Sequence, residues 1–167
     1  LIPKLLTNMT AGLISMKFGL MGINTTSVSA CASATSAMMD AYNYIRLGKA
    51  KAFITGGSEA GITEASIGGF GSMKALSTRN DHPEGASRPF DKERDGFVMG
   101  EGAGALVFEE YEHAKARCAH IYAEVSGAAM TADAYHISSP HPEGLGAARA
   151  MQLVLNEAQK SPEQLDY

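Results

Sequence analysis

Short β-branched runs alternate with helical patterns along this chain, and this alternation constrains the fold more than any other feature of the sequence. Apolar residues repeat at spacings of four, three and four in two segments, which predicts helices over residues 9–18 and 34–47. Gly48 follows the second segment, where a left-handed residue often ends a helix. The runs at residues 24–29 and 52–55 are typical of strands. The alternation predicts an α/β layer architecture.

The same two patterns continue toward the carboxyl end of the chain. They predict strands over 105–108 and 121–126, and helices over 62–70, 111–117 and 145–159. The residues expected on the apolar face of the last helix are Ala148, Met151, Leu155 and Ala158.

Residues 77–104 follow neither pattern and are rich in proline, glycine and charged side chains. A loop of this length within a compact domain usually has a function, such as lining a site. A solvated surface loop explains the composition equally well, so both interpretations stay open.

Composition excludes several classes of protein. The formal net charge is −4, whereas a nucleic-acid-binding surface would need clustered Lys and Arg. No apolar run approaches the roughly 20 residues of a membrane-spanning helix, and the first residues lack a signal-peptide pattern. Cys31 and Cys118 are far apart in dissimilar surroundings, which argues against a disulfide framework. We therefore expect a cytoplasmic protein that binds neither nucleic acid nor a membrane.

Cys31 lies between the strand expected at 24–29 and the helix expected at 34–47. We expect this strand to be central and covered on both faces, with Cys31 at the first turn of a buried helix. A thiol at the amino end of a helix meets unpaired N–H groups and the positive end of the helix dipole, and both favour the nucleophilic thiolate. Its small neighbours, such as Ala30 and Ala32, leave room for a substrate. A buried structural role is commoner for a cysteine, so position alone leaves both roles open.

Longer phrases around this cysteine are more specific. They are Ser29-Ala30-Cys31-Ala32-Ser33-Ala34, Gly68-Gly69-Phe70-Gly71, Ala75-Leu76-Ser77-Thr78-Arg79-Asn80, and Ser87-Arg88-Pro89-Phe90-Asp91 through Gly96-Phe97-Val98-Met99-Gly100-Glu101-Gly102-Ala103-Gly104. Together they resemble the β-ketoacyl-[acyl-carrier-protein] synthases, nearest to the elongating type, synthase II, and the resemblance covers essentially the whole chain.

The resemblance implies a thiolase-like layered αβαβα fold built from two similar halves, usually as a homodimer. Residues 1–117 would be the C-terminal part of the first half, and residues 118–167 the start of the second half. Because the chain does not begin with Met and the family's sequence starts well upstream, we expect an internal fragment with an incomplete fold.

The resemblance also implies an acyltransferase of fatty-acid synthesis. Such an enzyme elongates acyl-ACP by decarboxylative Claisen condensation with malonyl-ACP through a cysteine thioester. Its partner is acyl carrier protein, and it uses no cofactor beyond the phosphopantetheine arm that carries the substrates. The family's two catalytic histidines and its lysine belong to motifs that this chain lacks, so we expect the chain alone to be inactive.

Four residues match functional positions of the family. Cys31 would accept the acyl group, and its own N–H would contribute to an oxyanion hole. Phe70 would line the acyl-chain pocket, although ordinary aromatic core explains it too. Lys74 would face the acidic carrier protein, or simply be a solvated lysine. Ser138 would lie beside the phosphopantetheine arm, at a position where threonine is usual.

A charged cluster of Asp91, Arg94 and Asp95 resembles a support for the loop behind the site. An exposed group of ion pairs, which contributes little to stability, is an adequate alternative.

Three apparent motifs fail in their context. Residues 100–105 fit a dinucleotide-binding pattern, but they precede a strand instead of opening a helix. Residues 56–60 lack the final glycine of a hydrolase nucleophile elbow. The five histidines form no metal-ligand spacing, so we expect no metal site.

Two other functions stay open. A non-catalytic carrier-protein-binding or dimerisation subunit would be marked by loss of the nucleophile, whereas Cys31 is present. A thiolase-like enzyme acting on acyl-coenzyme A would share the fold but not the loop Arg88-Pro89-Phe90-Asp91.

Overall fold

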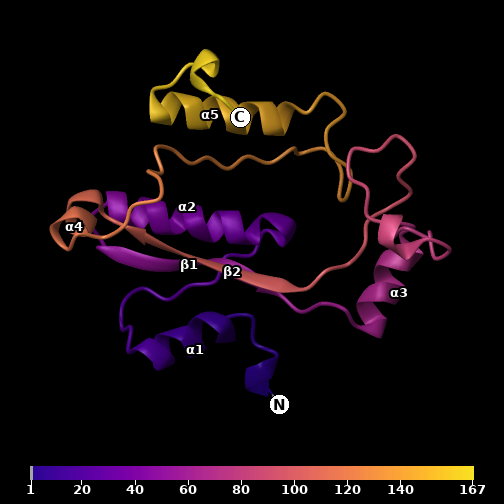
Figure 1. The fold of residues 1–167 in the computed structure, drawn as a ribbon, viewed down its shortest axis with the longest axis horizontal. Coiled ribbons are helices and arrows are strands. Elements are labelled where there is room, and N and C mark those ends of the chain that lie inside the picture. The colour runs from indigo at the N-terminus through magenta and orange to yellow at the C-terminus, as the bar shows by residue number, and fades with distance from the viewer. Residues whose placement is uncertain (1) are drawn as a thin grey trace. The chain divides into compact units, whose positions relative to one another are not determined.

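The computed structural model describes residues 2–167, apart from the side chain of Lys4 (Figure 1). Its helices and strands are α1 (Met9–Phe18), α2 (Ser33–Arg46), β1 (Ala52–Glu59), α3 (Glu64–Ser72), β2 (Gly102–Glu109), α4 (Tyr111–Ala116) and α5 (Leu145–Ala158). Short 3-10 turns occur at Ile2–Lys4, Ala30–Ala32, Pro83–Gly85 and Pro162–Gln164. The expected mixture of helices and strands is therefore present.

The chain divides into two compact units. Unit one comprises Leu1–Gly56 and Leu106–Tyr167, and unit two comprises Gly57–Ala105. Strands β1 and β2 pair in a two-stranded sheet. No helix in the described part of the chain is both long and apolar enough to cross a membrane.

Helix α2 contributes more buried side chains than any other element of unit one. Ala41 is 2% exposed, and Ser36 and Tyr42 are also buried. Tyr44 stacks on Phe53 of β1, with ring centroids 5.8 Å apart. The helix ends as its sequence predicts, because Gly48 adopts a left-handed conformation with φ of 68°.

An extended segment, residues 119–130, lies between α2 and α5 in Figure 1. Gly127 passes so close to α5 that a Cβ at this position would lie 2.8 Å from the carbonyl oxygen of Val154. On α5 itself, Leu155 is buried as expected, but Ala148 is exposed and Met151 is 67% exposed. The face predicted from sequence is therefore only partly right: Leu155 is buried and Ala158 borders Gly127 as expected, but Val154 borders Gly127 in place of Ala148 and Met151.

Two expected strands, 24–29 and 121–126, are wrong as strands. Both segments are extended, but among residues 2–167 only β1 and β2 form a ladder. Val28 is 80% exposed and Tyr122 is 93% exposed. Their residue types suit a strand, but a strand also needs a neighbour to pair with, and neither segment has one here.

The long loop is shorter than expected, because β2 already begins at Gly102. Strand β1 likewise continues past Gly56 to Glu59. The helix expected at 62–70 is shifted by two residues and begins after Thr63, whose hydroxyl oxygen accepts the N–H of Ser66.

Much apolar surface is left uncovered. The accessible area is 13233 Å², whereas a compact protein of 17.6 kDa exposes about 7,900 Å². Helix α1 has no buried residue, and its Leu13 and Met16 are 56% and 69% exposed. Burial within the described chain is therefore concentrated around α2 and its neighbours.

An ion-pair cluster joins the end of β2 to α4. Arg117 donates from Nε and Nη2 to the two carboxylate oxygens of Glu109, at 2.8 and 2.6 Å. Nδ1 of His113 contacts the same carboxylate. The hydrogen bonds from Arg117, followed by that from His113, lower the pKa of Glu109 to about 2.

This lowered pKa predicts an acid-sensitive contribution to stability. A carboxyl with a depressed folded-state pKa stabilises the fold above its unfolded pKa of 4.5, and that contribution is lost as the pH falls toward 2. We expect Glu109→Gln to remove this dependence, so that the melting temperatures of the two proteins converge over that range. Thermal melts followed by circular dichroism at low protein concentration measure the two melting temperatures. A difference between wild type and variant that stays constant over this pH range would contradict the prediction.

Candidate functional site

Cys31 occupies a strained turn directly before α2. It is the middle residue of the 3-10 turn Ala30–Ala32, and its thiol is exposed. Ala30 has a φ of 50°, a left-handed conformation that costs energy for any residue with a Cβ. Such strain persists only where surrounding contacts impose it, and it is concentrated at functional sites.

Serine hydroxyls impose this turn. The hydroxyl of Ser33 donates to the carbonyl oxygen of Ala30 at 2.7 Å and accepts the N–H of Ser29 at 2.9 Å. The hydroxyls of Ser29 and buried Ser36 share a hydrogen bond of 2.7 Å. The turn that carries Cys31 is therefore fixed to the first turn of α2.

The placement of Cys31 differs in two ways from the expectation. We expected the first turn of a buried helix after a central strand, but α2 begins at Ser33 and the preceding segment is unpaired. The N–H of Cys31 has no hydrogen-bond partner among residues 2–167. The site therefore offers an accessible thiol and a free backbone donor at the amino end of a helix.

Ser138, the second candidate in unit one, lies on an exposed loop that follows the extended segment. Nδ1 of His136 accepts the N–H groups of Ser138 and Ser139, at 3.2 and 3.1 Å. The N–H of His141 donates to Oδ2 of Asp133 at 2.9 Å. Local hydrogen bonds therefore shape this loop and leave the Ser138 side chain exposed.

Phe70 and Lys74 both belong to unit two. Phe70 lies on α3 and packs edge-to-face against Phe97, with centroids 5.2 Å apart. Lys74 follows α3 in a left-handed conformation with φ of 55°, and its side chain is exposed. Phe70 is 39% exposed, so part of its ring remains available for contact.

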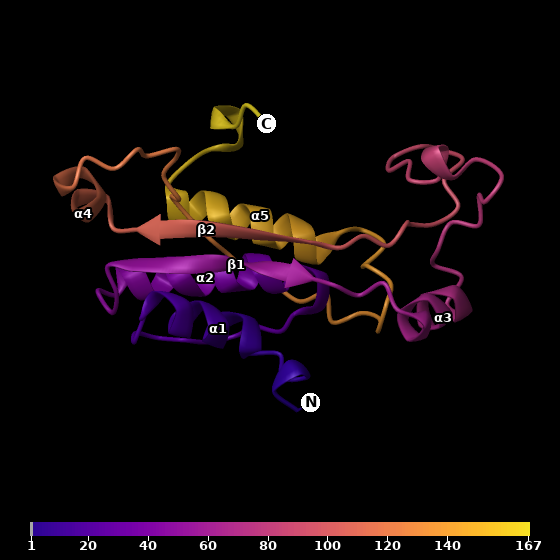
Figure 2. The same cartoon turned by 60° about the horizontal axis from the view of Figure 1, so that its bottom comes forward.

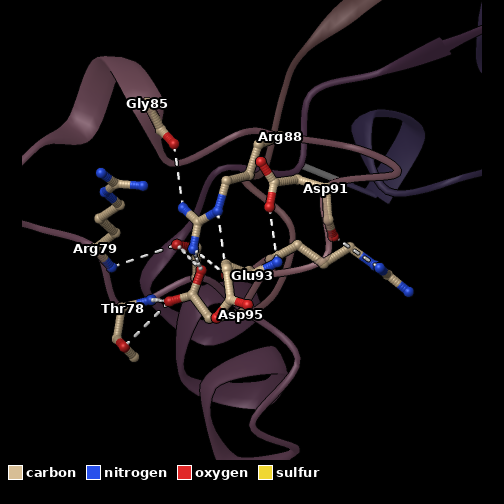
Figure 3. Close-up of polar contacts among 9 residues, drawn as sticks. Thr78, Arg79, Gly85, Arg88, Asp91, Glu93 and Asp95 are labelled. Carbon is tan, nitrogen blue, oxygen red and sulfur yellow. Dashed lines mark hydrogen bonds and ion pairs between the residues drawn. The ribbon is translucent and has the colours of Figure 1, made fainter.

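The charged loop of unit two is organised around Asp95 (Figure 3). Asp95 accepts the hydroxyl of Ser77 at 2.7 Å and the N–H of Thr78 at 2.9 Å, which together lower its pKa. Nη2 of Arg88 pairs with the same carboxylate at 3.1 Å. The expected cluster of Asp91, Arg94 and Asp95 is therefore wrong in its cation, because Arg88 pairs with Asp95, whereas Arg94 donates to the carbonyl oxygen of Asp91.

Arg88 also holds the loop backbone. Its guanidinium donates to the carbonyl oxygens of Gly85 and Glu93. Together with the bond to Asp95, all three guanidinium nitrogens donate to groups of the loop itself. Arg88 therefore supports the loop, a role that the sequence phrase alone did not identify.

Two cavities lie within the separate units. The cavity of unit two has a volume of about 820 Å³ and is lined mainly by residues 87–97, including Arg88, Lys92 and Arg94. The cavity of unit one, about 400 Å³, is mostly apolar and lies between α2 and residues 125–130. Among the residues described, no group of three His, Cys, Asp or Glu side chains could hold a metal ion.

Gly96 gives a direct test of the loop architecture. A Cβ at Gly96 would lie 2.3 Å from the backbone carbon of Leu76, whereas a Cβ at Gly100 would meet nothing within 4 Å. We expect Gly96→Ala to open the loop and to raise tryptic cleavage after Arg79 and Lys92 at least about tenfold. Gly100→Ala is the matched control, and equal cleavage of the two variants would refute this account of the loop.

Comparison with known proteins gives the family. The model of the β-ketoacyl synthase N-terminal domain matches residues 1–114, and that of the C-terminal domain matches residues 122–167. The chain is 52% identical over 167 residues to 3-oxoacyl-[acyl-carrier-protein] synthase 2 of Synechocystis, covering 100% of this chain and 40% of that protein. It is 51% identical to the putative mitochondrial synthase of Schizosaccharomyces pombe, covering 99% of this chain and 39% of that protein.

A solved structure agrees in fold. It is a type II PKS acyl-carrier protein in complex with its ketosynthase bound to the hexaketide, with a TM-score of 0.93 and 39% identity. The match covers 96% of this chain and 40% of that chain. The elements described above therefore form part of a thiolase-like ketosynthase fold, and the chain spans about 40% of the length of the relatives it matches. Because these two domain models together match residues 1–114 and 122–167, this chain belongs to the β-ketoacyl synthase family.

Proposed function

We propose that the protein containing this chain is an elongating 3-oxoacyl-[acyl-carrier-protein] synthase. The observation that carries the proposal is an accessible thiol, Cys31, in a strained turn with a free N–H, immediately before α2. The identity to synthases named for this reaction supports it over the whole chain. Retention of the nucleophile argues against a non-catalytic subunit.

In the first step the Cys31 thiolate attacks the thioester carbonyl of acyl-ACP. A bond forms between Sγ and the carbonyl carbon, and the negative charge moves to the carbonyl oxygen. The Cys31 N–H is available to donate to that oxygen. Collapse of this intermediate expels the phosphopantetheine thiolate, which takes up a proton, and leaves the acyl group on Cys31.

In the second step malonyl-ACP loses carbon dioxide, and the resulting enolate carbon attacks the Cys31 thioester. A carbon–carbon bond forms, the bond to Sγ breaks, and the 3-oxoacyl product remains on the carrier. Enolate formation needs donors that stabilise an oxyanion. In this family that task falls to two histidines and a lysine, which match no motif of this chain.

The other site residues complete the proposal. Phe70 would contact the acyl chain, Lys74 would pair with the acidic carrier protein, and Ser138 would lie beside the phosphopantetheine arm. The boundary between the two synthase halves would fall near residues 117 and 118. Three points stay predictions: the protein is a homodimer, it needs no cofactor besides the carrier-bound arm, and it is cytoplasmic. Relatives named as mitochondrial exist.

Acylation of Cys31 can be tested in a complete enzyme framework. The Synechocystis chimera is the Synechocystis synthase 2 in which this chain replaces the matching 167 residues. In this chimera acyl-ACP should acylate Cys31. Cys31→Ala should abolish the transfer, whereas Cys118→Ala, which alters the other exposed thiol, should leave it unchanged. Mass spectrometry of the trapped acyl-enzyme locates the group, and acyl mass on Cys118 or on a serine would overturn the assignment.

The 167 residues alone should catalyse no condensation. One donor to a developing oxyanion is worth roughly 2.7 to 4 kcal/mol, and the family's donors belong to motifs that are not in this chain. Carbon dioxide release from malonyl-ACP compares the chain with the chimera. Turnover by the chain within about tenfold of the chimera, a barrier difference of ~1.4 kcal/mol, would show that those donors are dispensable.

A further inference from the structure

A polar network joins α2, the extended segment and α5 within unit one. Arg46 of α2 pairs with Oε1 of Glu157 on α5. The other carboxylate oxygen of Glu157 accepts the N–H of Ala128 at 2.8 Å. Tyr42 accepts from Arg46 at 3.1 Å and donates its hydroxyl to the carbonyl oxygen of Ser126, also at 3.1 Å.

Both of these backbone groups belong to one short stretch, residues 126–128, of the extended segment that lies between α2 and α5 in Figure 1. In the view of Figure 2 the paired strands β1 and β2 lie in front of both helices. The residues at the two ends of the ion pair are 111 positions apart. Arg46 falls within the match to the N-terminal synthase domain, and Glu157 within the match to the C-terminal one. The network therefore bridges the two domains of the family.

The energetic value of the network lies in its backbone contacts. The side chains of Arg46 and Glu157 are 55% and 28% exposed, and an ion pair so open to solvent contributes little by itself. Tyr42, in contrast, is buried, and Ala128 is half-buried. Removing the acceptor at Glu157 would release the Ala128 N–H from α5 and leave the stretch held through Tyr42 at Ser126.

The anchored stretch leads directly into the loop that carries Ser138. Residues 131–144 contain the turns at His136 and His141, and they connect residues 126–130 to α5. At the other end, α2 begins two residues after Cys31. A fixed stretch between α2 and α5 therefore holds the base of this loop to the helix that follows the nucleophile.

We infer that Tyr42, Arg46 and Glu157 are positioning residues, which hold the Ser138 loop in a fixed relation to Cys31. The inference that this position affects acyl transfer rests on the proposed function, in which Ser138 lies beside the phosphopantetheine arm. The anchoring itself does not depend on it.

Hydrogen exchange of this chain within the Synechocystis chimera tests the anchoring. Glu157→Ala removes both the charge and the acceptor, and should speed exchange in residues 126–130 at least about tenfold. Glu157→Gln keeps an amide oxygen for Ala128, and should speed it less than about threefold. Arg149→Ala, at an exposed position on the same helix, is the control. Equal effects of the two Glu157 variants, or a rise spread evenly over α2 and β1, would contradict the inference.

Catalytic positioning is read out in the Synechocystis chimera. Glu157→Ala should slow acyl transfer from acyl-ACP to Cys31 about tenfold, because the loop that meets the arm is displaced. Alkylation of Cys31 by iodoacetamide should stay within about twofold, since the turn at Cys31 is held separately by serines. Parallel losses in both reactions, or no loss in transfer, would refute the positioning role. An unmodified chimera that takes no acyl group would sink the proposed function, while hydrogen exchange would still decide the anchoring.

Discussion

Burial of one face of α2 is the constraint on which the rest of unit one depends. Ala41 is almost fully buried, and nearby residues of the same helix contact the surrounding elements. Tyr44 contacts β1, whereas Tyr42 and Arg46 contact the extended segment and α5. The same helix fixes the turn of Cys31 through Ser33 at its amino end. Packing, the anchoring network and the candidate nucleophile therefore share one element.

Outside this element the chain buries little of its apolar surface. Among the residues described, the buried apolar side chains are Ala41, Tyr42, Ala86, Ala114 and Leu155. Large side chains such as Met16 and Val28 remain exposed, and the accessible area of 13233 Å² far exceeds the ~7,900 Å² typical of this mass. Local hydrogen bonds, such as those of Arg88 and Asp95, therefore do much of the ordering in the loops.

Local patterns predicted the helices well, because a helix satisfies its backbone within its own segment. Helix α1 matches its prediction, and α2 and α5 begin or end within one residue of theirs. Strands at 24–29 and 121–126 failed because a strand needs a partner that no local pattern supplies. The buried face of α5 was only partly predicted for a related reason, since the passing backbone at Gly127 decides which side is covered. The sequence identified Cys31 as the candidate nucleophile, but neither the left-handed Ala30 nor the contact between Arg46 and Glu157 had a sequence signal.

The central claim is that the turn before α2 presents Cys31 with a free N–H for acyl transfer. A crystal structure of the acylated chimera tests this most directly. The account predicts an acyl thioester on Sγ of Cys31, with its carbonyl oxygen about 2.7 to 3.1 Å from the Cys31 nitrogen. An acyl carbonyl directed away from this N–H, or an N–H already bonded to a protein carbonyl, would contradict it.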